Sequence, residues 1–132
     1  MAWKRSVLVV ANQTATSPQL REALRVRHEQ RPTSFILLVP AGRRPEALEL
    51  VDRVVAELRG DGLDVTGCVG DVDPFYAVHE IWDPGSYDEI LISTLPTGSS
   101  RWLRSNLPRR VERLTGALVT HVSVAGAVEV AA

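Results

Sequence analysis

Groups suited to binding phosphate lie close together between residues 93 and 106. Ser93 and Thr94 end a short apolar run, a Gly/Ser turn occupies residues 97–100, and a basic helix is predicted to follow. Hydroxyl groups, the backbone N–H groups of such a turn and the positive end of a helix all favour anions. A strand end, a Gly/Ser turn and a helix follow one another in this order in phosphate-binding sites. The turn here contains a single glycine, Gly98.

Charge is unevenly distributed along this part of the chain. Five arginines and one acid, Glu112, lie between residues 101 and 113, whereas residues 61–89 contain eight acidic side chains and no Lys or Arg. Blocks of opposite charge are most simply explained as two solvated faces of the protein. The alternative is a funnel that attracts an anionic ligand. We take the first interpretation.

The remaining reactive side chains form no recognisable catalytic or metal-binding motif. His28, His79 and His121 lie on different predicted elements, without a partner at metal-ligand spacing, and no Gly-x-Ser-x-Gly motif occurs. Cys68 is the single cysteine, which excludes an internal disulfide and a cysteine-rich zinc site. We therefore expect no bound metal and name no catalytic residue.

Two other kinds of phosphate-handling domain fit less well. A phosphoacceptor receiver domain needs an acidic pair after its first strand and a lysine after its fifth, but here Asn12 and Gln13 follow the first strand and Lys4 is the one lysine. A flavodoxin-type FMN site is a rival, because residues 14–17 supply hydroxyls after the first strand. No glycine accompanies them, so a capped helix start is the simpler interpretation.

Length and composition indicate one ordinary domain spanning residues 1–132. A chain of 132 residues, 45% of them hydrophobic, can bury a core without metal or disulfide cross-links. The formal net charge of -1 argues against a general nucleic-acid binder. The apolar run 7–11 is too short for a signal peptide or a membrane span. We expect a cytoplasmic protein without a nucleic-acid or membrane partner.

Apolar runs and helical periodicities alternate along the whole chain. Five runs are predicted to be strands, at residues 6–12, 34–40, 63–70, 88–96 and 118–124. Pro18, capped by Ser17, begins the first helix, and Pro74 begins the third. The second helix is predicted to start at Pro45 and to end just before Gly60, with an inward stripe of Leu48, Val51, Val54, Val55 and Leu58.

Five strands separated by four helices predict an α/β fold with a single doubly wound parallel sheet. In such sheets, ligands bind beyond the carboxyl ends of the strands, where the strand order reverses. The strand ends that this rule nominates are Asn12, Val39 with Pro40, Gly70 with Asp71, and Ser93 with Thr94.

Four motifs, in their order and spacing, resemble the universal stress proteins over essentially the whole chain. They are VVAN at 9–12, VGDVDP at 69–74, DEILIST at 88–94 and VTHVSV at 119–124. The resemblance implies the adenine nucleotide alpha hydrolase-like variant of the Rossmann-like fold, with strand order 3-2-1-4-5. It also implies homodimers that pair through their last strands, here residues 118–124. In one branch of the family, ATP or AMP is bound.

The resemblance assigns binding roles to individual residues. Asn12 stands where the family usually has an Asp that meets the adenine or ribose, so hydrogen bonding is kept and the charge is lost. Val39 falls where the backbone contacts adenine. Gly70 and Asp71 match a Gly-Asp pair before the third helix.

The phosphate loop departs from the family pattern of Gly-x-x-Gly, nine residues, then Gly-Ser or Gly-Thr. Pro96 and Ser99 occupy the places of the first two glycines. Pro96 and Pro108 have no N–H to donate. Asn106 is still a good N-cap for the helix that continues to residue 115. We expect weakened or lost nucleotide binding, with a residual site made of Gly98, Ser99, Ser100, Ser105 and Asn106.

These observations predict a universal stress protein-like, homodimeric, non-catalytic binding module. The first alternative is an ATP- or AMP-binding protein with slow hydrolase activity at Asn12, Asp71 and the loop 98–106. The second is a partner protein whose basic helix docks on an acidic surface. The dimer prediction also has a physical basis, since residues 116–128 contain no charge, Lys or Pro to protect an outer strand.

Overall fold

The computed structural model describes residues 4–96 and 100–124. Its strands are β1 (Arg5–Val10), β2 (Thr33–Pro40), β3 (Asp64–Gly70), β4 (Glu89–Thr94) and β5 (Leu118–Ser123). Its helices are α1 (Pro18–Gln30), α2 (Pro45–Gly60), α3 (Pro74–Ile81), α4 (Arg101–Arg104) and α5 (Leu107–Thr115). Among these described helices, none is long and apolar enough to cross a membrane.

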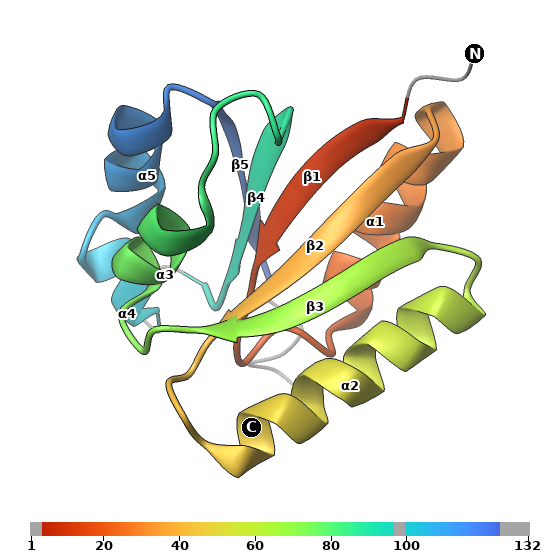
Figure 1. Cartoon of the computed structure of the whole chain (residues 1–132), viewed down its shortest axis with the longest axis horizontal. Helices are drawn as coiled ribbons and strands as arrows, with labels where there is room; N and C mark the ends of the chain where they lie inside the picture. The colour runs from red at the N-terminus through yellow and green to blue at the C-terminus, as the bar shows by residue number, and fades with distance from the viewer. Residues whose placement is uncertain (1–3, 97–99, 125–132) are drawn as a thin grey trace.

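The strands form one parallel sheet in the order β3-β2-β1-β4-β5, as predicted. Helices α1 and α2 cover one face, and α3, α4 and α5 cover the other (Figure 1). Each face has its own apolar core because the side chains of a buried strand alternate between the two faces. In β1, for example, Val7 and Val9 pack towards α1 and α2, whereas Leu8 and Val10 pack towards α3 and α5.

The helices begin where proline and a capping side chain predict. Ser17 Oγ accepts a hydrogen bond from the N–H of Leu20 at 3.1 Å, which caps α1. Asp73 Oδ1 accepts one from the N–H of Phe75 at 2.9 Å, which caps α3. Proline stands in the first turn of α1, α2, α3 and α5, where its missing N–H costs no intrahelical bond.

The predicted basic helix is two helices. Its first turn, α4, is capped by Ser100 Oγ, which accepts a hydrogen bond from the N–H of Leu103 at 3.3 Å. Asn106 precedes α5 in a left-handed conformation (φ 59°, ψ 39°), and its side chain makes no capping bond. Asn106 is therefore the N-cap residue of α5, as predicted, but its side chain does not cap the helix. Asparagine tolerates this conformation better than most residues, so it can supply the bend between α4 and α5.

The buried stripe of α2 differs from the prediction at its first residue. The stripe consists of Ala47, Val51, Val54, Val55 and Leu58. Leu48 is 60% exposed, so its assignment to the core is wrong. It shares a helix face with Val55, at the edge of the stripe, but it lies in the first turn, where it is left largely uncovered. Gly60 belongs to the helix, and Gly62 adopts the positive φ of 88° that follows it.

Candidate functional site

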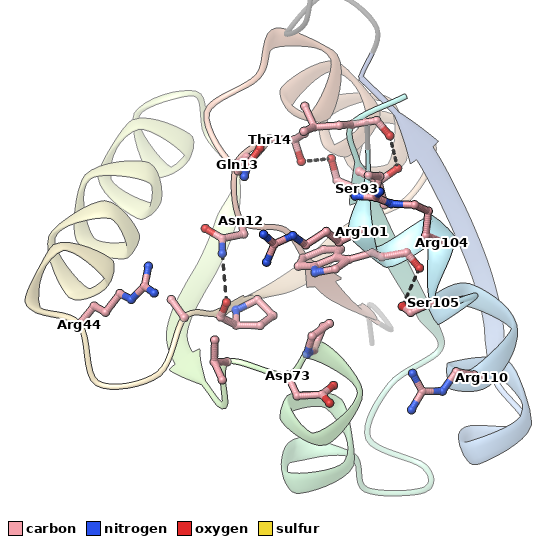
Figure 2. A pocket seen from close by; sticks show the side chains of 18 residues that line it. Asn12, Gln13, Thr14, Arg44, Asp73, Ser93, Arg101, Arg104, Ser105 and Arg110 are labelled. Carbon is pink, nitrogen blue, oxygen red and sulfur yellow. Dashed lines mark hydrogen bonds between the residues drawn. The ribbon is translucent and has the colours of Figure 1, made fainter. Parts of the chain in front are cut away.

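A crevice of about 630 Å³ opens at the carboxyl ends of β1 and β4, where the strand order reverses. Its volume is within the range of ordinary small-molecule sites. Four loops and the helices α4 and α5 contribute to its wall (Figure 2). The lining residues are Asn12, Gln13, Thr14, Pro40, Ala41, Arg44, Val72, Asp73, Pro74, Ser93, Thr94, Leu95, Ser100, Arg101, Trp102, Arg104, Ser105 and Arg110.

The residues nominated as strand ends or as parts of the phosphate loop do not all reach the crevice. Those that line it are Asn12, Pro40, Ser93, Thr94, Ser100 and Ser105. Those that are described but do not line it are Val39, Gly70, Asp71 and Asn106. Two further residues, Gly98 and Ser99, lie outside the described residues.

Asn12 joins two of the loops that form the crevice. Its Nδ2 donates a hydrogen bond to the carbonyl oxygen of Pro40 at 3.0 Å (Figure 2). This bond fixes the orientation of the side-chain amide. The amide oxygen accepts no hydrogen bond from any residue that the structure describes, so it is free for a donor group on a ligand.

The hydroxyl groups at the end of β4 are already engaged in the protein. Ser93 Oγ lies 2.6 Å from Thr14 Oγ1, which ties the loop after β1 to β4. Thr94 Oγ1 donates to the carbonyl oxygen of Leu95 at 2.8 Å and lies 2.6 Å from Nε2 of His121. Either atom can donate in the bond between Thr94 Oγ1 and His121 Nε2, depending on the tautomer of the imidazole ring. Burial lowers the pKa of His121, which favours the neutral form of the ring.

Gly70 and Asp71 shape the wall without lining it. A Cβ at Gly70 would lie 2.8 Å from both Ala77 Cβ and Leu38 Cδ1, so only glycine lets α3 approach β3 this closely. The Gly70 carbonyl accepts hydrogen bonds from the N–H groups of the next loop, at Ala41 and Gly42. Asp71 is exposed, and its Oδ1 accepts a hydrogen bond from the N–H of Asp73 at 2.8 Å.

Val39 packs in the core, and Asn106 connects two helices. The Val39 side chain is 0% exposed and packs in the core beneath α1 and α2. Asn106 forms the left-handed link between α4 and α5. Neither residue offers a side chain to the crevice, although Asn106 sets the direction of both helices that border it.

Four arginines that sequence reasoning did not nominate for the site border the crevice. Arg44 precedes α2, Arg101 and Arg104 lie in α4, and Arg110 lies in α5. In the view of Figure 2, Arg44 and Arg110 stand on opposite sides, with Arg101 between them. The crevice contains one acidic side chain, Asp73, among its lining residues. The wall is therefore strongly cationic.

One signal in the sequence could have identified two of these arginines. Arg101 and Arg104 are three residues apart, so they share one face of a helix. Arg110 and Arg113 have the same spacing of three residues, but only Arg110 lines the crevice, so the spacing alone does not identify the site. The guanidinium carbon of Arg110 lies 4.4 Å from the centroid of the Phe75 ring, so the aromatic face holds the side chain at the rim.

The acidic run 61–89 does not face these arginines as one block. Asp61 pairs with Arg21 at 2.6 Å, and Glu89 pairs with Arg27 at 2.8 Å. Asp64 forms an ion pair with Lys4. Within residues 4–96 and 100–124, none of the four crevice arginines has an ion-pair partner. Their charge is thus open to solvent or to a ligand.

Structural comparison finds the same fold in universal stress proteins. One from Archaeoglobus fulgidus superposes with a TM-score of 0.62 at 16% identity, covering 89% of this chain and 93% of the other. A universal stress protein in complex with cAMP gives 0.64 at 16% identity, covering 95% and 100%. The Archaeoglobus fulgidus protein in complex with dAMP gives 0.54 at 16% identity, covering 92% and 99%. No family model and no curated protein matches the sequence.

Proposed function

We propose that this protein is a universal stress protein-like homodimeric module that binds a small phosphate-bearing ligand, an adenine nucleotide, without converting it. The observation that carries the proposal is the cationic crevice, in which four arginines face one carboxylate at the strand-order reversal. Guanidinium groups are the side chains best matched to phosphate, because they donate paired hydrogen bonds in a planar fork. Two of the structures with the same fold contain a nucleotide, cAMP or dAMP.

The crevice also offers groups that suit the base and ribose of a nucleotide. Asn12 presents a carbonyl oxygen that can accept a hydrogen bond from a base amino group or a ribose hydroxyl. Val72 is 63% exposed and also lines the crevice, so it offers an apolar surface to a base. Arg101 and Arg104 of α4 and Arg110 of α5 line the same crevice, and Figure 2 shows Arg101 on the side towards Asn12 and Arg110 farther from it.

The arginine side chains can compensate for the missing glycines of the turn. Loss of glycines from the turn predicts weaker contacts between phosphate and backbone N–H groups. Side-chain donors can replace those contacts, since charge-assisted hydrogen bonds are stronger than neutral ones. We therefore propose that nucleotide binding is retained, whereas the sequence predicts that it is weakened or lost.

The proposed absence of turnover rests on the state of the crevice side chains. The single carboxylate of the wall, Asp73, caps α3 through its Oδ1. Ser93 is hydrogen-bonded to Thr14, and Thr94 is held between Leu95 and His121. His121, whose Nε2 is hydrogen-bonded to Thr94, is not among the residues that line the crevice. No activated nucleophile follows from this arrangement.

The proposed homodimer uses the open edge of β5. Val124 N–H donates to the carbonyl oxygen of Thr94 on β4 at 2.8 Å. Because successive residues of a strand alternate sides, the N–H groups of Val119, His121 and Ser123 point away from β4. Pairing these groups with the same strand of a second copy about a two-fold axis would satisfy them.

Calorimetry on protein freed of bound ligand tests the proposal. We expect saturable binding of at least one of ATP, AMP and cAMP, and no release of phosphate or AMP during incubation with ATP. The matched pair of variants is Arg104→Gln, which removes a crevice charge, and Arg113→Gln, which removes a charge from α5 outside the crevice. Only the first should weaken binding.

Three outcomes would count against the proposal. Absence of binding by all three nucleotides at millimolar concentration would reject a nucleotide site. Equal weakening by Arg104→Gln and Arg113→Gln would indicate a general charge effect. Steady ATP turnover that is lost on changing Asn12 or a crevice arginine would support the slow hydrolase alternative instead.

A further inference from the structure

The four crevice arginines come from three separate elements, so their common orientation depends on how these elements are placed. Arg44 is held at the start of α2 as its N-cap residue, where it makes no side-chain capping bond. Arg101 and Arg104 lie on one face of α4. Arg110 reaches the crevice because the left-handed Asn106 turns α5 away from the line of α4.

The lining of the crevice carries more positive than negative charge. Four guanidinium groups face a single carboxylate, whose Oδ1 already accepts a backbone hydrogen bond. Unpaired arginines also occur elsewhere in the described chain, at Arg31, Arg43, Arg53, Arg59, Arg109 and Arg113, so what distinguishes the crevice is that four of them line one cavity with one carboxylate. The wall therefore exceeds its own acidic charge by three, which a ligand with one phosphate would neutralise only in part.

The crevice also lacks the groups that would hold a metal ion beside a phosphate chain. Across the part of the chain that is described, no cluster of three His, Cys, Asp or Glu side chains could coordinate a metal. Magnesium at phosphate sites is usually held by one or two carboxylates together with the phosphates. Here, the wall contains one carboxylate, Asp73, and one of its two oxygens already accepts the bond that caps α3.

We infer that these arginines bind the phosphate chain directly, as metal-free counter-ions, and make the site selective for ligands that carry several phosphates. The inference rests on the proposed function and goes further, since it names the residues that determine specificity and the number of charges they recognise. Each added phosphate supplies oxygens for another charge-assisted hydrogen bond. Magnesium bound to the ligand would compete for the same oxygens, so it should weaken binding.

The experiment is a calorimetric series with ATP, ADP, AMP and inorganic tripolyphosphate, each in EDTA and in excess magnesium. In EDTA, ATP is expected to bind at least about tenfold more tightly than AMP, since one further charge-assisted hydrogen bond contributes about that much. Excess magnesium should reduce the affinity for ATP and leave that for AMP nearly unchanged. Tripolyphosphate should compete with ATP.

Variants locate the effect on the arginines. Arg104→Gln and Arg110→Gln should each lower the affinity for ATP about tenfold and that for AMP by less, since AMP has fewer phosphate oxygens to lose. Arg113→Gln, on α5 but outside the crevice, is the control and should match the wild type. Thermal melts of the free proteins check that each variant is folded.

The outcomes separate the inference from the proposed function. If ATP and AMP bind equally, or ATP needs magnesium, the inference is overturned while the nucleotide site stands. If tripolyphosphate binds and the nucleotides bind no better, the arginines hold phosphate as inferred, but the adenine part of the proposed function fails. If none of the four ligands binds, both fail.

Discussion

The carboxylate of Glu89 is 2% exposed and holds together four elements at the amino ends of the strands. Arg27 of α1 donates to it through Nε at 3.0 Å and Nη2 at 2.8 Å. Thr120 of β5 donates at 2.5 Å, and Arg5 of β1 lies at 3.3 Å. Replacing Glu89 with Gln keeps the size of the side chain and removes its charge. This substitution isolates the electrostatic contribution from any cavity.

The loss of stability depends on how well water can solvate the two arginines that lose their partner. Removing one partner of a fully buried ion pair costs about 3–5 kcal/mol. The Arg27 side chain is 18% exposed and that of Arg5 is 30% exposed, so water can partly solvate their charges. We therefore expect Glu89→Gln to lower the free energy of unfolding by about 2–3 kcal/mol at pH 7. In a domain of this size, that corresponds to a fall in Tm of roughly 6–12 °C.

The effect should depend on pH in a defined direction. Burial raises the pKa of Glu89, but the hydrogen bonds from Arg27 and Thr120 and the charges of Arg27 and Arg5 lower it by more. The net pKa therefore lies below its ordinary value of 4.5. The folded state binds this proton less readily than the unfolded state. The stability difference between wild type and Glu89→Gln should be full above pH 4.5 and should shrink as the pH falls through the native pKa.

Urea unfolding followed by tryptophan fluorescence at several pH values measures this difference. The matched control is Glu22→Gln, because Glu22 forms an ion pair with Arg25 on the exposed surface of α1 and should contribute little. A loss below about 0.5 kcal/mol for Glu89→Gln at pH 7 would refute the argument from burial. A difference that grows towards low pH would refute the sign of the pKa shift.

Three further predictions concern packing, backbone conformation and assembly. Gly70→Ala should lower the free energy of unfolding by about 1–3 kcal/mol, since its Cβ would lie 2.8 Å from a side chain of α3. The control Gly60→Ala has open space around the new methyl group, so it should raise the free energy of unfolding by about 0.5–1 kcal/mol in urea unfolding. Asn106→Ala should cost about 1–2 kcal/mol in the same assay because of its φ of 59°, and Asn106→Gly should be nearly neutral. Light scattering behind a sizing column should give a dimer for wild type and a folded monomer for Ser123→Pro, because the N–H group of Ser123 points away from β4. Val122→Pro should instead lower the free energy of unfolding, because it removes a hydrogen bond to β4.

Each of these predictions has an outcome that contradicts it. Equal stability of Gly70→Ala and wild type would mean that α3 can move away from β3 at no cost. A stable Asn106→Ala protein would show that the bend between α4 and α5 does not need its left-handed residue. A wild-type monomer at micromolar concentration, or a fully dimeric Ser123→Pro protein, would remove β5 as the dimer edge.

Local patterns in the sequence determined most of the architecture. Apolar runs predict the five strands, and Ser17 with Pro18 and Pro74 mark helix starts that the structure contains. These features depend on residues within one or two turns of each other, so they can be read without knowing the fold. The resemblance to universal stress proteins supplied the strand order, and the rule for parallel sheets then directed attention to the correct edge.

Tertiary structure decided which side chains share the crevice. A helical period shows that Arg101, Arg104 and Arg110 lie off the apolar stripe, but the direction in which they point depends on the left-handed backbone of Asn106 and on the sheet beneath α5. Arg44 joins them from a distant loop. The strand-end rule also nominated Val39 and Asp71, which do not line the crevice, because the Val39 side chain packs in the core and Asp71 accepts a hydrogen bond within its own turn. A cationic site assembled from four single arginines has no local signature, because long-range placement of the elements creates it.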